Sequence, residues 1–183
     1  AFYVHDLKGM GIGAGPQGSA SELATWAVIN ALRLDGDGTV LENCSLGAGT
    51  DLILSGDLDA IHGFTGAPVS GLAQLPERVP SRLLRYTQHD LYDPAVIPAG
   101  TYPGHSLDVD TFGVKCLLCV DVSMDEELVY SMTQALWESA DIMGELYPAM
   151  SVLSDRDFLC EDLPIPLHDG AQRFYEEVCP ELV

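Results

Sequence analysis

Gly9-Met-Gly-Ile-Gly-Ala-Gly-Pro-Gln-Gly-Ser-Ala-Ser-Glu22 predicts a short strand of small residues that runs through a glycine-rich turn into a helix. The helix is expected over residues 19–34, where apolar side chains at Leu23, Ala27 and Ala31 recur at helical spacing. Further elements alternate along the chain: a strand at 39–44, a helix at 46–55 and a strand at 59–65. Strands that alternate with helices are typical of parallel βαβ units. The sequence therefore predicts an α/β fold.

The remainder of the chain is less regular. Its expected elements are a helix at 68–75, a proline-rich and mostly irregular stretch at 76–105, a strand at 109–122, a helix at 125–147 and a last helix at about 170–178. The 109–122 strand has almost no polar alternation, with apolar residues at Val114, Leu117, Leu118 and Val120, which is typical of a central strand covered on both faces. Ser123 and Glu126 are expected to form a capping box at the start of the long helix.

Composition and charge exclude several classes of partner. The 183 residues carry 8 basic and 28 acidic side chains, a formal net charge of −20. Such a chain lacks the excess of basic residues with which proteins bind nucleic acid or an anionic membrane surface. We therefore expect no nucleic-acid partner. No uninterrupted apolar run reaches the ~18–20 residues that span a bilayer, so no membrane-spanning helix is expected.

The glycine-rich turn is the most informative candidate site. The first backbone N–H groups of a helix have no intrahelical acceptor, and with the helix dipole they can bind a carboxylate or a phosphate. Gln17, Ser19 and Ser21 could add side-chain hydrogen bonds. Equally, Ser19 and Glu22 fit a capping box that would use the same donors without any ligand. Spacing alone does not choose between these two interpretations, and the bare Gly13-x-Gly15-x-x-Gly18 pattern is a weak signal.

Catalytic and metal-binding patterns are poor. The five histidines lie in separate segments, and neither a nucleophile elbow nor a zinc-helix motif occurs. Cys116 and Cys119 form a C-x-x-C, but no second pair completes a zinc site. We expect them to be unbridged core cysteines on opposite faces of the central 109–122 strand. The sequence thus predicts neither an enzyme nor a cofactor or metal site.

Several segments, in this order, resemble the TAXI family of solute-binding proteins, the extracytoplasmic receptors of TRAP-type secondary transporters. They are Asp6-Leu-Lys-Gly9, the glycine–serine turn, Leu54-Ser-Gly-Asp-Leu-Asp-Ala60, Gly66-Ala-Pro68, Ile97-Pro-Ala-Gly-Thr-Tyr-Pro-Gly104 and Leu163-Pro-Ile-Pro-Leu-His-Asp-Gly-Ala171. The resemblance extends from about Asp6 to Val178. It implies a type II periplasmic-binding-protein fold of two α/β lobes joined by crossover segments. Residues 6–98 would form the second lobe, and residues 99–183 the return crossover and the C-terminal part of an incomplete first lobe.

The resemblance also implies a ligand and a compartment. The ligand would be a small organic acid, such as glutamate, glutamine or a 2-oxo or dicarboxylic acid, held in an interlobe cleft. The implied binding residues are Gln17, Gly18, Ser19 and Ser21 in the turn, Thr65, Gly66 and Pro68 in a facing loop, and Tyr102 near the hinge. The protein would be periplasmic or extracytoplasmic, with TRAP membrane permease subunits as partners.

Two further expectations follow from this comparison. The family's opening first-lobe section has no counterpart in the chain, so a second copy or a separate chain is expected to complete that lobe by strand addition or domain exchange. The alternative function, from a different class, is a ligand-sensing regulatory module built on the same fold.

Overall fold

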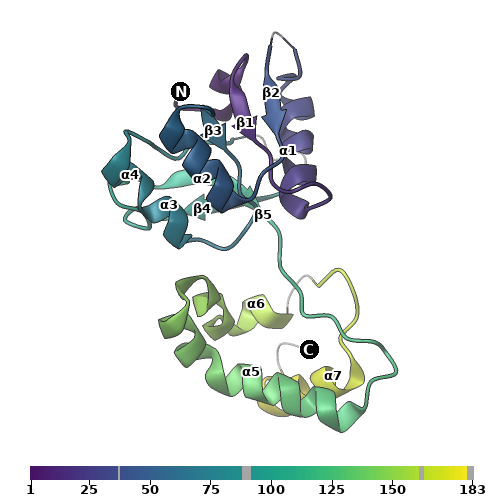
Figure 1. Cartoon of the computed structure of the whole chain (residues 1–183). Coiled ribbons are helices and arrows are strands. Elements are labelled where there is room, and N and C mark those ends of the chain that lie inside the picture. Colours follow the sequence, from purple (N-terminus) through teal and green to yellow (C-terminus); the bar gives the residue numbers. More distant parts are fainter. Residues whose placement is uncertain (37, 88–91, 161–162, 181–183) are drawn as a thin grey trace. The chain divides into compact units, whose positions relative to one another are not determined.

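The computed structural model describes residues 1–36, 38–87, 92–160 and 163–180. The chain forms two compact units, Ala1–Lys115 and Cys116–Val183 (Figure 1). The lobe boundary expected from the resemblance lies earlier, after Pro98. The first unit extends further because β4 (Asp93–Ile97) pairs antiparallel with β5 (Val109–Gly113), which holds the intervening residues against it.

A parallel sheet lies at the centre of the first unit. Its strands are β1 (Gly11–Gly13), β2 (Val40–Glu42) and β3 (Ala60–Ile61), in the order β2-β1-β3. Helix α1 (Ala20–Ala31) connects β1 to β2, and α2 (Leu46–Ser55) connects β2 to β3. The predicted α/β class with parallel βαβ units is confirmed, although each strand is shorter than expected.

Helix α1 buries a different face from the one predicted. Ala24, Thr25, Val28 and Ile29 are buried, whereas Leu23 is 66% exposed. Ile29 joins a core cluster with Leu7, Ile12 and Leu34. Because the helix carries apolar residues around most of its circumference, the spacing of Leu23, Ala27 and Ala31 did not identify the face that meets the sheet.

The rest of the first unit is built from short elements. They are the 3-10 helix η1 (Val4–Leu7), helices α3 (Ser70–Ala73) and α4 (Leu75–Arg78), and the β4–β5 hairpin. Strand β4 was not predicted, because its segment was assigned to the irregular proline-rich stretch. Pro94 is tolerated in β4 because, within the described residues, the strand pairs with β5 alone and is therefore an edge strand.

The predicted 109–122 strand is wrong beyond Gly113. Strand β5 ends there, and residues 114–121 adopt no regular structure. Cys116 and Cys119 are therefore not on a central strand, and both are exposed free thiols. The apolar composition was correct for a strand, but a strand also needs a neighbour, and none pairs with these residues in the part of the chain that the structure describes.

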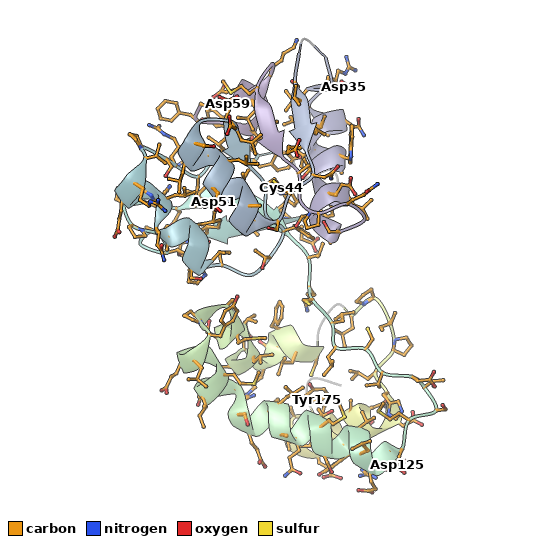
Figure 2. All side chains as sticks on the ribbon, viewed as in Figure 1. Asp35, Cys44, Asp51, Asp59, Asp125 and Tyr175 are labelled. Atoms are coloured by element: carbon orange, nitrogen blue, oxygen red, sulfur yellow. The ribbon has the colours of Figure 1, made fainter. Side chains whose placement is uncertain are left out.

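The second unit is helical where it is described. It contains α5 (Glu126–Leu146), the 3-10 helix η2 (Pro148–Ser154), α6 (Arg156–Cys160) and α7 (Asp169–Val178). Asp125, labelled in Figure 2, caps α5 by accepting a hydrogen bond from the Leu128 N–H at 3.0 Å, so the expected cap by Ser123 is wrong. No helix among the described residues is both long enough and apolar enough to cross a membrane.

Candidate functional site

The topology of the parallel sheet identifies the edge at which a ligand would bind. The chain leaves β1 for β2 on one side and returns to place β3 on the other side of β1. In open α/β sheets, ligands bind at the carboxyl ends of strands at such a switch point. The glycine-rich turn follows β1, and residues 62–68 follow β3. The structure thus brings the two predicted binding segments to the same edge of the sheet.

The start of α1 shows part of the capping box expected for Ser19 and Glu22. Ser19 Oγ accepts from the Glu22 N–H at 3.2 Å, and Glu22 Oε2 accepts from the Gly18 N–H at 2.5 Å. Among the described residues, none accepts a hydrogen bond from the backbone N–H of Ala20 or Ser21. The N-terminus of the helix therefore keeps two donors after its capping interactions are satisfied.

Gly15 is required where the turn enters the helix. Its φ of +87° lies in the left-handed region, and a Cβ built there would be 2.5 Å from Ser21 Cβ. Gln17 and Gly18 are exposed on the turn, and Ser19 and Ser21 are half-buried.

The loop after β3 is held against the start of α1. Ser21 Oγ accepts from the Phe64 N–H at 3.1 Å, so this hydroxyl is partly committed to positioning the loop. Thr65 and Gly66, which follow directly, are exposed, and Pro68 is half-buried after a cis peptide bond from Ala67.

Tyr102 fixes the far end of the same loop. It is only 4% exposed, and its hydroxyl accepts from the Val69 N–H at 2.9 Å. The structure therefore gives Tyr102 a positioning contact one residue beyond Pro68. The loop is tied at one end to α1 and at the other to Tyr102, which leaves Thr65 and Gly66 between the two attachments.

Three residues at this edge were not predicted: Thr25, Asn43 and His62. Asn43 Nδ2 donates to the Gly15 carbonyl at 3.0 Å and to Glu22 Oε1 at 2.8 Å, so it braces the turn and orients the Glu22 carboxylate. Asn43 and His62 each directly follow a strand, β2 and β3 respectively. Polar residues immediately after parallel strands are the sequence signal that could have identified them.

His62 lies in a hydrogen-bonded network beneath the start of α1. The Thr25 hydroxyl donates to the Ser21 carbonyl at 2.7 Å, so His62 Nδ1, which is 2.7 Å from Thr25 Oγ1, acts as the donor in that contact. Removal of the imidazole from water lowers the pKa of His62, and the Ser21 carbonyl opposes this shift. The imidazole is therefore neutral at pH 7. The positive potential at this edge of the sheet comes from the backbone dipoles at the start of α1.

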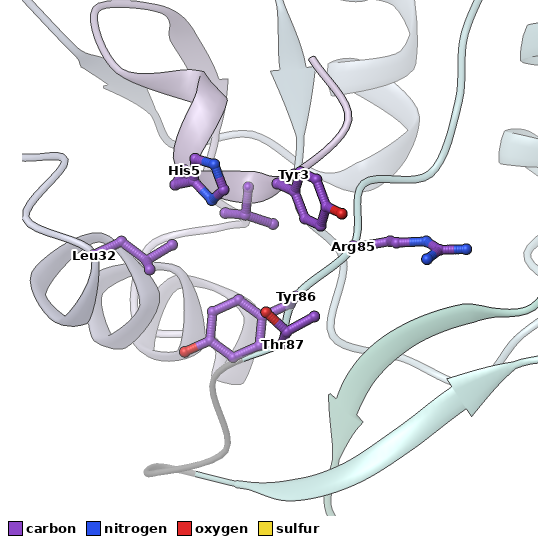
Figure 3. A pocket seen from close by; sticks show the side chains of 7 residues that line it. Tyr3, His5, Leu32, Arg85, Tyr86 and Thr87 are labelled. Atoms are coloured by element: carbon purple, nitrogen blue, oxygen red, sulfur yellow. The ribbon is translucent and has the colours of Figure 1, made fainter.

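Two hollows lie elsewhere on the first unit. A cavity of about 40 Å³, lined by Tyr3, Val4, His5, Leu32, Arg85, Tyr86 and Thr87, is shown in Figure 3. It is far smaller than the roughly 300 Å³ at which ligand pockets begin. A groove of about 750 Å³ beside it includes Arg82, Leu107 and Asp108. Neither hollow contains a predicted binding residue.

Comparison with known families agrees with this geometry. A sequence model described as the NMT1-like family matches residues 3–178. The chain belongs to the NMT1-like family. This family has a periplasmic-binding-protein-like fold, and its members are solute-binding proteins. For an NMT1-like protein, loops that converge at the carboxyl edge of a parallel sheet are the appropriate place for a small solute.

Proposed function

We propose that this NMT1-like protein is the extracytoplasmic solute receptor of a TRAP-type transporter, of the TAXI kind, and that it binds a small carboxylate. Glutamate, glutamine and 2-oxo or dicarboxylic acids are the candidate ligands. Residues 6–98 then belong to the second lobe of the binding protein, residues 99–183 to the return crossover and first lobe, and the partners are the membrane permease subunits.

One observation carries the proposal for the ligand. The backbone N–H groups of Ala20 and Ser21 remain without an acceptor in the described chain, at a switch point where the loop of Thr65 and Gly66 is attached beside them. Two adjacent N–H groups at the positive end of a helix dipole suit the two oxygens of a carboxylate. His62 is neutral and adds no positive charge of its own, so the attraction for a carboxylate comes from these backbone groups.

The surroundings also favour a ligand with more than one polar group. The Glu22 carboxylate already accepts from the Gly18 N–H next to the donors, and it repels a simple anion placed beside it. A ligand that also carries an ammonium or amide group would offset this repulsion, as glutamate or glutamine would. We therefore expect amino acids to bind more tightly than the corresponding dicarboxylic acids.

A proline substitution tests the helix donors without removing the helix. Ala20 is the first residue of α1, it is exposed, and Ser19 before it is extended with φ −82° and ψ 160°. Proline is favoured at this position, so Ala20→Pro deletes one N–H while the fold is retained. We expect the affinity for glutamate, measured by calorimetry, to fall about tenfold, the loss of about 1.4 kcal/mol.

Ala20→Ser is the matched control, since it changes the side chain and keeps the N–H. Its affinity should stay within about twofold of the unmodified chain, a difference below 0.5 kcal/mol. Equal affinities for the proline and serine variants, with melting temperatures unchanged, would remove α1 from the site. Failure of the unmodified chain to bind any of the candidate acids would refute the proposed ligand class.

A further inference from the structure

The carboxylate of Glu22 has a fixed place beside the start of α1. Its Oε2 atom accepts a hydrogen bond from the Gly18 N–H at 2.5 Å, and its Oε1 atom accepts one from Asn43 Nδ2 at 2.8 Å. In a full capping box this carboxylate would accept from the N-cap N–H, but the Ser19 N–H donates instead to the Pro16 carbonyl at 3.0 Å. The position of Glu22 is therefore set by Gly18 and Asn43.

The side-chain amide of Asn43 has one orientation that satisfies its contacts. Its Nδ2 atom carries two hydrogens, and it donates to the Gly15 carbonyl at 3.0 Å as well as to Glu22. A flipped amide would place Oδ1 against two acceptor oxygens, so the contacts decide which atom points at the turn. Gly15 is buried and packs closely against Ser21, so Asn43 attaches Glu22 to a rigid part of the turn.

This attachment keeps the donors at the helix start open. The N–H groups of Ala20 and Ser21 lie in the same first turn of α1 as Glu22. A carboxylate in that turn is attracted to the positive end of the helix dipole. Without the hydrogen bond from Asn43, the Glu22 carboxylate can turn toward these donors and compete with the carboxylate of a ligand. With the hydrogen bond, its charge stays beside the donors and does not cover them.

The same arrangement provides a partner for a cationic group on the ligand. Each carboxylate oxygen has two lone pairs, and the two bonds that hold Glu22 use one on each oxygen. Both donors are neutral amides, so they leave the negative charge of Glu22 uncompensated. An ammonium group beside the ligand's carboxylate would form a charge-assisted hydrogen bond with Glu22, whereas a ketone at that place would offer only another acceptor.

We propose that Asn43 determines the specificity of the site for α-amino acids, by holding Glu22 where it binds the ligand's ammonium group. This inference rests on the proposed function, in which the N–H groups of Ala20 and Ser21 bind the ligand's carboxylate. An α-amino acid has its carboxylate and its ammonium on one carbon, as the donors and Glu22 share one helical turn. Asn43 acts through Glu22 and is therefore a positioning residue.

Glutamate and 2-oxoglutarate test this specificity, since they share both carboxylates and differ in an ammonium or a ketone at one carbon. In calorimetry the unmodified chain should bind glutamate about tenfold or more tightly than 2-oxoglutarate. For Asn43→Ala, the affinity for glutamate should fall about tenfold, and the two dissociation constants should come within about twofold of each other. Asn30→Ala is the matched control, because Asn30 is also an exposed asparagine but lies in the last turn of α1. Its preference for glutamate should equal that of the unmodified chain.

A second substitution tests whether Asn43 acts through Glu22. Glu22→Gln removes the charge at nearly unchanged size, so it should also abolish the preference for glutamate. A double variant, Asn43→Ala with Glu22→Gln, should show the same ratio of dissociation constants as either single variant, since both changes remove one and the same contact. A double variant whose ratio changes by the product of the two single effects would overturn the inference.

Amide NMR tests the position of Glu22 without any ligand. The Gly18 amide proton donates to the carboxylate, so its resonance should move upfield in Asn43→Ala as that hydrogen bond weakens. The resonance of the Ala20 or Ser21 amide proton should move downfield as the carboxylate approaches. Resonances of Gly18, Ala20 and Ser21 that all stay unchanged would show that Asn43 does not position Glu22, and the inference would be wrong.

Two results distinguish a failure here from a failure of the proposed function. If the unmodified chain binds neither glutamate nor 2-oxoglutarate, the proposed ligand class fails, and the specificity role of Asn43 fails with it. If the unmodified chain binds both compounds and Asn43→Ala weakens both equally, Asn43 has only a structural role. The second result refutes this inference alone and leaves the proposed function standing.

Discussion

Replacing Gly170 with alanine should separate the two long helices of the second unit. Gly170 is buried at the second position of α7 and lies directly against α5. A Cβ at this position would overlap the Glu126 carbonyl oxygen, lie 2.8 Å from the Tyr130 backbone nitrogen and lie 3.1 Å from Val129 Cβ. None of these atoms belongs to the end of a flexible side chain, so α7 must move away from α5.

The size of the effect follows from two opposing contributions. Overpacking in a well-packed interface costs about 1–3 kcal/mol and occasionally more, and the clash here lies at the upper end because backbone atoms are involved. Alanine is a better helix former than glycine by up to about 1 kcal/mol. We therefore expect the free energy of unfolding of the second unit to fall by about 2 kcal/mol.

Gly47 provides a closely matched control. It is the second residue of α2, a helix of 10 residues like α7, and a Cβ there meets no atom within 4 Å. Gly47→Ala should therefore stabilise the first unit by about 0.5–1 kcal/mol, the difference in helix propensity alone. The two substitutions differ in the space around the new methyl group and have the same position in a helix of the same length.

The change in the free energy of unfolding can be measured by urea unfolding of these variants, each made together with Trp26→Phe. Trp137 is then the sole tryptophan. Its ring packs on Phe174 of α7 with centroids 5.8 Å apart, so its emission reports the contact between α5 and α7. The midpoint of the Trp137 transition should fall for Gly170→Ala and stay unchanged for Gly47→Ala. A Gly170→Ala chain as stable as its parent would show that the helices can separate at no cost, and the packing argument would then be wrong.

Two further predictions concern the site. Because the folded state lowers the pKa of His62, its neutral form contributes stability that is complete above the unfolded value of about 6.5 and declines as the pH falls below it. The unfolding free energy from pH 7.5 to 5 should therefore fall more steeply for the parent than for His62→Gln, and parallel curves would contradict this. Tyr102→Phe should cost about 1–2 kcal/mol, because the Val69 N–H loses its acceptor at a partly buried position. Tyr147→Phe, at a side chain 53% exposed, should change stability by less than about 0.5 kcal/mol in the same thermal or urea measurement.

Much of the fold could be predicted because it depends on local sequence. The helices α2 and α5 were located within a residue at each end, since their caps and apolar spacing lie within the helices themselves. The glycine-rich turn and the alternation of strands with helices identified the parallel sheet. Turn chemistry and caps act between residues a few positions apart, so the chain itself contains the relevant pattern.

The candidate site was predicted only in part. Ser19, Ser21, Thr65, Gly66 and Pro68 lie on two segments that the structure does bring to one edge of the sheet. Tyr102 proved to hold the loop through Val69, and Asn43 and His62 were missed. Their positions depend on which strand ends are neighbours, and strand order is set by contacts between distant residues.

The sequence by itself determined the α/β class, the positions of α2 and α5, the strong negative charge and the turn that opens α1. The single helix expected at 68–75 is instead two short helices, α3 and α4. Only the tertiary structure decided which face of α1 is buried and where the strand that starts at Val109 ends. Side-chain composition makes residues 114–122 suitable for a sheet, but a strand persists only where another backbone accepts and donates its hydrogen bonds. In the described chain, β4 is that partner as far as Gly113. Strand β5 therefore ends where its pairing with β4 ends, and the composition of the segment could not have shown this end.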